Sequence, residues 1–412
     1  MQADIAIIVV AYNRPQSLSR LLWSLQAADY TGFANIPLII SIDYSGDDKC
    51  EAIASRFDWK HGEKKIIAHS QNLGLKNHIL QCGDMALLYD GVIVLEDDLF
   101  VSPAFYPYAQ QAYRFYKDAE AIAGIGLYNY PFNEIAFCPF VPIADGYDNY
   151  FMQVPCSWGQ LWTKQQWQNF KAYYSAAADF NFHLLPEVVQ AWPSATSWKK
   201  IFYQYIVERN LYFLYPRISL TTNFGDKGQH HSAETMVWQS ALLLRNMNFR
   251  FSQIENAISI YDAYFELSVE AYNRFTNQSL DICIDLNGSK PLSKVNNRFL
   301  LSSKYCGTPQ QKFGMQLYPF EKNVLMNLEP LNNSTNFFSL SHTKEFEQRL
   351  GVDRRFLDIN RSFMNIDFIV DKGRNEIKNS NDYKLGHFLL KPFYFLNNKF
   401  NIFNRKPKKN GQ

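Results

Sequence analysis

Residues 91–98 read GVIVLEDD, five residues of an apolar run followed by three carboxylates. Short, continuous apolar runs rich in β-branched residues are typical of strands that are covered on both faces, as in a parallel sheet. Three more runs of this kind precede it, at residues 5–11 (IAIIVVA), 37–42 (PLIISI) and 65–68 (KIIA). The first part of the chain therefore contains four predicted core strands.

Segments with helical spacing separate these strands. Four leucines, at positions 18, 21, 22 and 25, recur at intervals of three or four after Pro15, which is placed where a helix can begin. Strands that alternate with helices predict an α/β fold with a mostly parallel sheet flanked by helices. The further expected elements are a helix over 75–89, a helix from 105 to about 118, a strand over 121–128, a Trp-rich helix within 155–167 and a helix over 197–210.

The length of 412 residues exceeds the usual size of one hydrophobic core, so more than one structural unit is expected. Beyond residue 255 the composition changes, because Asn becomes frequent and the strand-like pieces become short. We expect a first domain at residues 1–255, a smaller C-terminal domain at 256–375 and a basic tail at 376–412.

Charge and cysteine usage exclude several classes of protein. The formal net charge of +2 gives no sign of nucleic acid as a partner. Six scattered cysteines without a CxxC motif argue against a zinc site or a disulfide scaffold, and we expect mostly buried thiols in a reducing compartment. No secretion signal and no run of roughly 18 apolar residues is visible. The sequence favours a cytoplasmic protein, peripheral at the inner face of the cell membrane.

The membrane expectation rests on the tail. Between Lys384 and Gln412 the chain has seven Lys or Arg residues and no Asp or Glu, and the cations alternate with aromatic and aliphatic residues. Such basic aromatic segments bind anionic lipid surfaces, so residues 384–409 are the predicted membrane contact. The alternative is a helix packed on the C-terminal domain, followed by a disordered basic end.

Polar side chains end three of the predicted strands. Arg14 follows the first, Asp43 the second and Glu96, Asp97 and Asp98 the fourth. Ligands of open α/β sheets collect at the carboxyl ends of the strands, and adjacent carboxylates there can hold a divalent cation against a diphosphate. A solvated acidic turn, a surface ion pair and a helix cap are the alternatives for the triplet, the arginine and Asp43.

Several short motifs occur in one order over about residues 4–235, and together they carry a resemblance. They are AYNR at 11–14, SID at 41–43, VLEDDL at 94–99 with Pro103 and Phe105, PRIS at 216–219 and FGDKG at 224–228 with His230 and His231. In this order the chain resembles the inverting GT-A glycosyltransferases of the N-acetylglucosaminyltransferase I family and related bacterial enzymes of surface-polysaccharide assembly. The resemblance implies a GT-A (Rossmann-like) fold.

The resemblance also implies roles for individual residues. Arg14 and Asp43 would hold the nucleoside, and Asp98 with Asp97 would hold Mn²⁺ (or Mg²⁺) against the diphosphate of a UDP-sugar. The transferred sugar would be of GlcNAc type or similar, and the acceptor a glycan or a lipid-linked oligosaccharide. The other positions on the donor side are Asn72, Gly74, His78, Glu96, Trp158, Gly159 and His230.

One position departs from the resembling family, which has a Trp-Asp pair whose Asp is the general base. Here Trp198 is followed by Lys199. Since an ordinary ammonium group is protonated at neutral pH, Lys199 is not expected to accept the proton of the acceptor hydroxyl. Glu187 is the predicted base, with Asp145 and Asp148 as alternatives. A catalytically inactive protein that binds nucleotide-sugars or glycans on the same fold is the other interpretation.

Two other nucleotide-binding classes are disfavoured. A nucleotidyltransferase needs a Gly-rich phosphate loop after its first strand, and a dinucleotide-dependent oxidoreductase needs GxGxxG there. Residues 11–14 contain no glycine.

Overall fold

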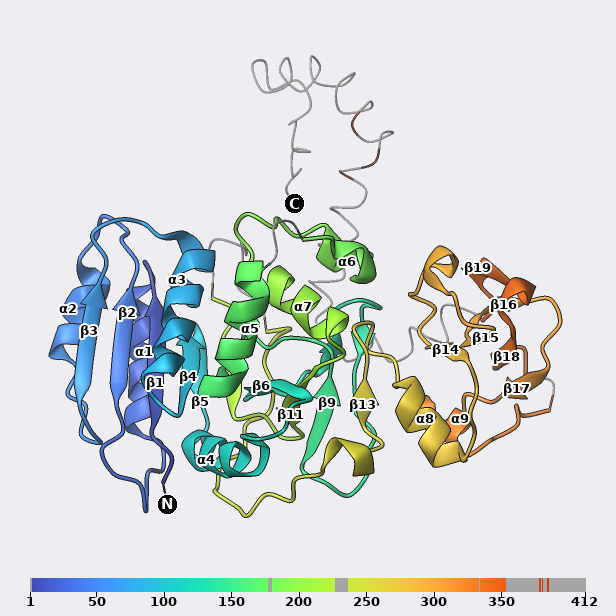
Figure 1. Cartoon of the computed structure of the whole chain (residues 1–412), viewed down its shortest axis with the longest axis horizontal. Coiled ribbons are helices and arrows are strands. Elements are labelled where there is room, and N and C mark those ends of the chain that lie inside the picture. Colours follow the sequence, from blue (N-terminus) through green and yellow to red (C-terminus); the bar gives the residue numbers. More distant parts are fainter. Residues whose placement is uncertain are drawn as a thin grey trace, which may run out of the picture. The chain divides into compact units, whose positions relative to one another are not determined.

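The structure is a computed structural model that describes residues 2–176, 180–226, 236–332 and 334–352, together with residues 378, 380 and 384. Its centre is a nine-stranded sheet with the order β13-β9-β11-β6-β10-β4-β1-β2-β3 (Figure 1). The strands span Ile5–Ala11 (β1), Leu38–Ile42 (β2), Lys64–Ala68 (β3), Gly91–Glu96 (β4), Ile122–Gly126 (β6), Asn149–Met152 (β9), Gln160–Thr163 (β10), Tyr212–Pro216 (β11) and Ile260–Tyr261 (β13).

Parallel pairing dominates this sheet. Neighbouring strands are parallel in five pairs, which include the contiguous run from β3 through β2 and β1 to β4. The other three pairs are antiparallel, since β10 lies antiparallel to both β4 and β6, and β11 to β9. Because β1, β2 and β4 are parallel neighbours, their carboxyl ends meet at one edge of the sheet. The expected mostly parallel α/β fold is confirmed.

Helices cover both faces of the sheet and give a three-layer arrangement. Alternate side chains of β1 point to opposite faces, so that Ile5, Ile7 and Val9 join one apolar cluster while Ala6, Ile8 and Val10 join the other. Helices α1, α2 and α4 pack against the first face, and α3, α5 and α7 against the second. These helices span Pro15–Gln26 (α1), Lys49–Arg56 (α2), Gly74–Asp84 (α3), Phe105–Tyr116 (α4), Lys164–Ala176 (α5) and Trp198–Glu208 (α7).

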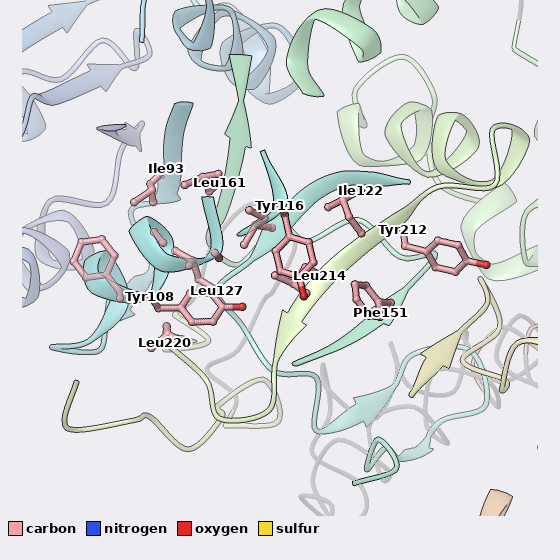
Figure 2. Packing of buried hydrophobic residues seen from close by; sticks show 14 of the residues in the cluster. Ile93, Tyr108, Tyr116, Ile122, Leu127, Phe151, Leu161, Tyr212, Leu214 and Leu220 are labelled. Atoms are coloured by element: carbon pink, nitrogen blue, oxygen red, sulfur yellow. The ribbon is translucent and has the colours of Figure 1, made fainter. Parts of the chain in front are cut away.

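The first cluster is rich in large aromatic side chains. Figure 2 shows Tyr108 and Tyr116 of α4 among the strand residues Ile93, Leu161 and Leu214, and all five are essentially inaccessible to solvent. Phe, Trp and Tyr make up 16% of the chain, and full burial of their rings accounts for part of this high content. That content is thus explained in part without any ligand.

A second, smaller sheet of four strands follows, with the order β14-β15-β18-β17. Glu266 connects its first strand to the preceding segment, because its carboxylate accepts hydrogen bonds from the backbone N–H groups of Leu286 and Asn287. The boundary expected at residue 255/256 stays a prediction, and β13 still belongs to the nine-stranded sheet. The elements span Val269–Thr276 (α8), Ile282–Asp285 (β14), Phe299–Ser302 (β15), Gln311–Phe313 (β17), Glu321–Leu325 (α9) and Phe338–His342 (β18).

Three short antiparallel pairs accompany these sheets. They are β5 (Leu99–Val101) with β12 (Thr221–Asn223), β7 (Phe132–Asn133) with β8 (Cys138–Pro139), and β16 (Lys304–Cys306) with β19 (Phe346–Leu350). All six cysteines are free thiols, four of them buried, as expected. Within the part of the chain that the structure describes, no helix is long and apolar enough to cross a bilayer.

Two local expectations were wrong. Residues 160–163 form β10, and the helix expected within 155–167 begins only at Lys164. The helix expected over 75–89 ends at Asp84 and is followed by a 3₁₀ turn, Met85–Leu87. A fully buried strand shows no alternation, so the tryptophans around 160 gave no sign of the strand.

Gly83 of α3 yields a prediction for stability. A Cβ atom built at Gly83 would lie 2.1 Å from the ring of Trp167, which is fully buried on α5. We expect Gly83→Ala to lower the free energy of unfolding by about 1–3 kcal/mol through overpacking. The urea midpoint of the full chain measures this. A higher midpoint, as for an exposed helical glycine, would contradict the close approach of α3 and α5.

Candidate active site

Arg14 joins the ends of β1 and β4. Its guanidinium forms an ion pair with Asp97 through Nη2 and a second with Asp98 through Nη1, at 2.9 Å from Oδ2. Burial alone would lower the pKa of Arg14, but the two carboxylates raise it above its ordinary value. Arg14 directly precedes Pro15, the first residue of α1, so the helix fixes the point from which the guanidinium reaches across. The strand ends thus meet in a charged cluster.

The carboxylates of this cluster are crowded. Burial raises the pKa of Asp97 to about 6, although Arg14 acts in the opposite direction. Burial also raises the pKa of Glu96 to about 8, with Asp98 adding to the rise while Arg14 and Lys199 oppose it. Carboxylates packed in this way disfavour one another's charge unless further positive charge is present. The cluster is therefore suited to binding a cation or the cationic part of a complex.

Asp98 has one oxygen available for such a cation. Its Oδ2 accepts from Arg14, whereas its Oδ1 is buried and has no hydrogen-bond partner among the described residues. Both oxygens of Asp97 are engaged, one by Arg14 and the other by the backbone N–H of Tyr12 at 3.4 Å. Nowhere in the described ranges do three or more His, Cys, Asp or Glu side chains form a preassembled metal site. The unpartnered Asp98 oxygen fits a divalent cation that completes its shell with ligand oxygens.

Asp43, at the end of β2, organises the loop before α3. Its carboxylate accepts hydrogen bonds from the backbone N–H groups of Leu73 at 2.8 Å and Gly74 at 3.0 Å. The Asn72 side chain donates to the carbonyl of Tyr44, 3.0 Å away. Gly74 has a φ of +72°, a conformation that favours glycine. Asp43, Asn72 and Gly74 are thus brought together, with the carboxylate committed to the backbone of the loop.

His78 lies behind this loop, on α3. Its Nε2 is 2.7 Å from Oγ of Ser41, which also contacts Nε2 of His69 at 3.2 Å. Burial lowers the pKa of His78 to about 4, so the imidazole is neutral at physiological pH. A buried, neutral imidazole lacks the charge that favours a phosphate. His78 is hydrogen-bonded to Ser41, and the rest of its side chain is buried in the protein interior.

Trp158 and Gly159 lie at the turn before β10. Gly159 has a φ of +91°, and a Cβ atom there would lie 2.7 Å from the Thr221 side chain. The half-buried indole of Trp158 packs against Tyr130 and Trp238, with ring centroids 5.6 and 5.2 Å away. These rings form an aromatic cluster that the sequence did not predict beyond Trp158.

Lys199 joins the aromatic cluster to the acidic one. Its Nζ donates to the hydroxyl of Tyr130 at 3.3 Å and lies 5.4 Å from the ring centroid of Trp158 and 5.5 Å from that of Trp192. Its charge also acts on Glu96, whose pKa it lowers. The residue that replaces the expected base is therefore part of the site. No local signal marks this, because the rings come from segments far apart in the sequence.

Glu187 lies apart from these contacts. It is the first residue of α6 (Glu187–Gln190), its side chain is 52% exposed, and it pairs with Lys294 at 2.6 Å. The two alternative carboxylates have structural partners. Asp145 pairs with Arg217 and accepts two backbone hydrogen bonds, while Asp148 accepts the backbone N–H of Arg250. Of the three, Glu187 is the most accessible to solvent.

The loop that contains His230 lies outside the described residues. On its N-terminal side, Asp226 is held by Arg20 and by the hydroxyl of Ser17 at 2.7 Å, both on α1. The neighbouring Phe224 donates its backbone N–H to the carbonyl of Asp98, 3.1 Å away. The chain therefore returns to the acidic cluster immediately before this loop.

Part of the chain is similar to known proteins. Residues 6–162 match the family described as glycosyl transferase family 2. No curated protein sequence matches the chain. Among solved structures, the chain is similar to the mannosyltransferase PcManGT from Pyrobaculum calidifontis in complex with GDP-Man and Mn²⁺, with 11% identity and a TM-score of 0.30. That match covers 42% of this chain and 47% of the mannosyltransferase, less than half of its length.

The matched range contains β1, β2, β4 and the cluster of Arg14, Asp97 and Asp98, whereas Lys199 and Glu187 lie beyond it. Residues 6–162 thus match glycosyl transferase family 2, and they belong to an α/β fold of the GT-A (Rossmann-like) type.

Proposed function

We propose that the chain transfers a sugar from a UDP-sugar to a glycan acceptor with inversion at the anomeric carbon, in a reaction that depends on Mn²⁺ or Mg²⁺. The observation that carries this proposal is the unpartnered, buried Oδ1 of Asp98 beside the ion pairs of Arg14. The role in surface-polysaccharide assembly and a GlcNAc-type donor rest on the resemblance alone.

On the donor side, Asp98 would hold the metal, with Asp97 as the supporting carboxylate. When bound, such a cation neutralises charge on a departing diphosphate. Arg14 keeps Asp97 and Asp98 in place from the side of β1. Asp43 would act on the nucleoside mainly by shaping the loop of Asn72 and Gly74, because its carboxylate oxygens accept from that loop.

On the sugar side, Trp158, Gly159 and Glu96 would border the transferred sugar. An indole face suits the apolar face of a pyranose ring, and a carboxyl group can bond to hydroxyls. His230, which lies outside the described residues, would contact the phosphate or the metal, and His78 would support the nucleotide from behind. Each of these roles is a proposal.

The acceptor hydroxyl must lose a proton as the new bond forms, and we assign this to Glu187. Its exposed carboxylate, at the start of α6, pairs with the exposed Lys294. The position of Lys199 favours a second candidate function, an inactive protein that binds nucleotide-sugars or glycans.

An assay of UDP release separates the two functions. The full chain is incubated with Mn²⁺ and a panel of UDP-sugars, with GDP-mannose as a comparison donor, and free nucleoside diphosphate is measured. The proposal predicts release from at least one UDP-sugar and loss of release on chelation with EDTA. Binding of a UDP-sugar without hydrolysis or transfer would establish the non-catalytic function instead.

We further propose that residues 384–409 attach the enzyme to an anionic membrane surface, where a lipid-linked oligosaccharide would serve as acceptor. All of this segment except Lys384 lies outside the described residues. A chain ending at residue 379 is expected to lose flotation with vesicles that contain anionic lipid, because its cations and aromatic side chains are removed. Vesicles of neutral lipid are the control. Equal flotation of the two chains with anionic vesicles would rule out this role.

A further inference from the structure

Helix α7 begins at Trp198, and its first turn contains two lysines, Lys199 and Lys200, and no acidic residue. This arrangement is unfavourable, because the N-terminus of a helix carries partial positive charge. Residues that are unfavourable for the local structure, and that no other contact compensates, are expected at functional sites. Each lysine therefore needs its own explanation.

The contacts of Lys200 explain its presence. Its ammonium donates to the carbonyls of Gln190 at 2.6 Å and Trp192 at 2.7 Å. Its backbone N–H donates to the hydroxyl of Ser197, which caps the helix. The side chain is buried and connects the end of α6 to the start of α7. Lys200 is structural.

Lys199 has no comparable set of partners. Among the described residues it makes one hydrogen bond, to the hydroxyl of Tyr130, and no ion pair with a carboxylate. An ammonium has three donors, so two remain for a ligand. The side chain is half-buried, so a ligand can reach it. The charge is held in place by the rings of Tyr130, Trp158 and Trp192.

These rings indicate the kind of ligand. Trp158 and Trp192 are half-buried, which leaves part of each residue accessible. Indole faces suit the apolar faces of sugar rings, and an ammonium with unused donors beside them favours a negative group. The combination fits a ring that carries a carboxylate better than a neutral sugar.

We propose that Lys199 is a specificity-determining residue that binds the carboxylate of an acidic sugar, such as a hexuronic acid, over the aromatic rings of the site. The inference rests on the proposed function and names its substrate class. The acidic sugar is either the transferred sugar of the donor or a residue of the acceptor, and two pairs of probes distinguish these sources.

The experiment measures binding of matched pairs to the full chain with Mn²⁺. The donor pair is UDP-glucuronic acid and UDP-glucose, and the acceptor pair is methyl β-D-glucuronide and methyl β-D-glucoside. We expect the charged member of one pair to bind about tenfold more tightly, as for a hydrogen bond between charged groups. Lys199→Met should abolish this preference, and Lys199→Arg should keep most of it. Lys171→Met, which removes a lysine paired with Asp84, should leave it unchanged.

Binding of UDP alone with Mn²⁺ is the separate readout of the donor site. If wild type binds UDP but shows no charge preference in either pair, or if the preference persists in Lys199→Met, the assignment of Lys199 is wrong while the proposed function stands. If Lys199→Met lowers UDP affinity without any charge preference in wild type, Lys199 serves the acidic cluster, which also overturns the assignment. If the wild-type chain does not bind UDP in the presence of Mn²⁺, this result would count against the proposed function itself.

Discussion

Asp98→Ala is expected to abolish the Mn²⁺-dependent part of UDP binding, with a loss in affinity of about 100-fold or more, since a bound metal stabilises a diphosphate by several kcal/mol. The substitution removes the Oδ1 atom that is buried without a partner among the described residues, and it leaves Arg14 paired with Asp97 alone. The measurement is UDP affinity by calorimetry with Mn²⁺ and with EDTA.

Asp90→Asn is the matched control for this substitution. Asp90 lies at the opposite end of β4, where its carboxylate accepts the backbone N–H of Asp4 at 2.9 Å. The control should bind UDP as wild type does, and both variants should unfold close to the wild-type temperature. If Asp98→Ala keeps its Mn²⁺-dependent affinity, Asp98 is not a ligand of the metal.

Glu187→Gln is expected to lower the rate of sugar transfer by about 10²–10⁴-fold, the range for loss of a general base. The amide cannot accept the proton of the acceptor hydroxyl, but it preserves the size of the side chain. UDP affinity should not change, because Glu187 lies outside the matched donor segment and contacts none of its carboxylates. The measurement is the transfer rate at saturating donor, together with the dissociation constant of UDP.

Glu255→Gln, at an exposed glutamate of the 3₁₀ turn Ile254–Asn256, is the control and should transfer sugar at the wild-type rate. A Glu187→Gln enzyme with an unchanged rate would move the base to another carboxylate. Because Glu187 is exposed to solvent, this substitution is a strict test of its assignment as the general base.

The cluster of Arg14, Asp97 and Asp98 could be predicted from the sequence because these residues lie at strand ends. Continuous apolar runs mark β1, β2 and β4, and parallel neighbours bring their carboxyl ends together. The partners of Arg14 could not be predicted, because the type of residue at a strand end does not determine which side chain it contacts. Arg14 was expected at the nucleoside, and the structure shows it paired with two carboxylates.

The surroundings of Lys199, which we propose to contact the sugar, could not be predicted in the same way. From the sequence alone, Lys199 is notable only because it occupies the position where an aspartate was expected. Its surroundings come from Tyr130, Trp158 and Trp192, which lie on three separate segments and meet only in the folded chain. The antiparallel β10 was missed for a related reason, because a fully buried strand has neither helical nor alternating periodicity.

The most direct test of the donor site is the position of the metal. Crystals of the full chain with UDP and Mn²⁺ would be measured at a wavelength where manganese scatters anomalously. We predict one strong anomalous peak at coordination distance from Oδ1 of Asp98 and from the diphosphate of UDP. A peak away from Asp98, or ordered UDP at the ends of β1, β2 and β4 without any manganese peak, would contradict the metal-dependent site proposed here.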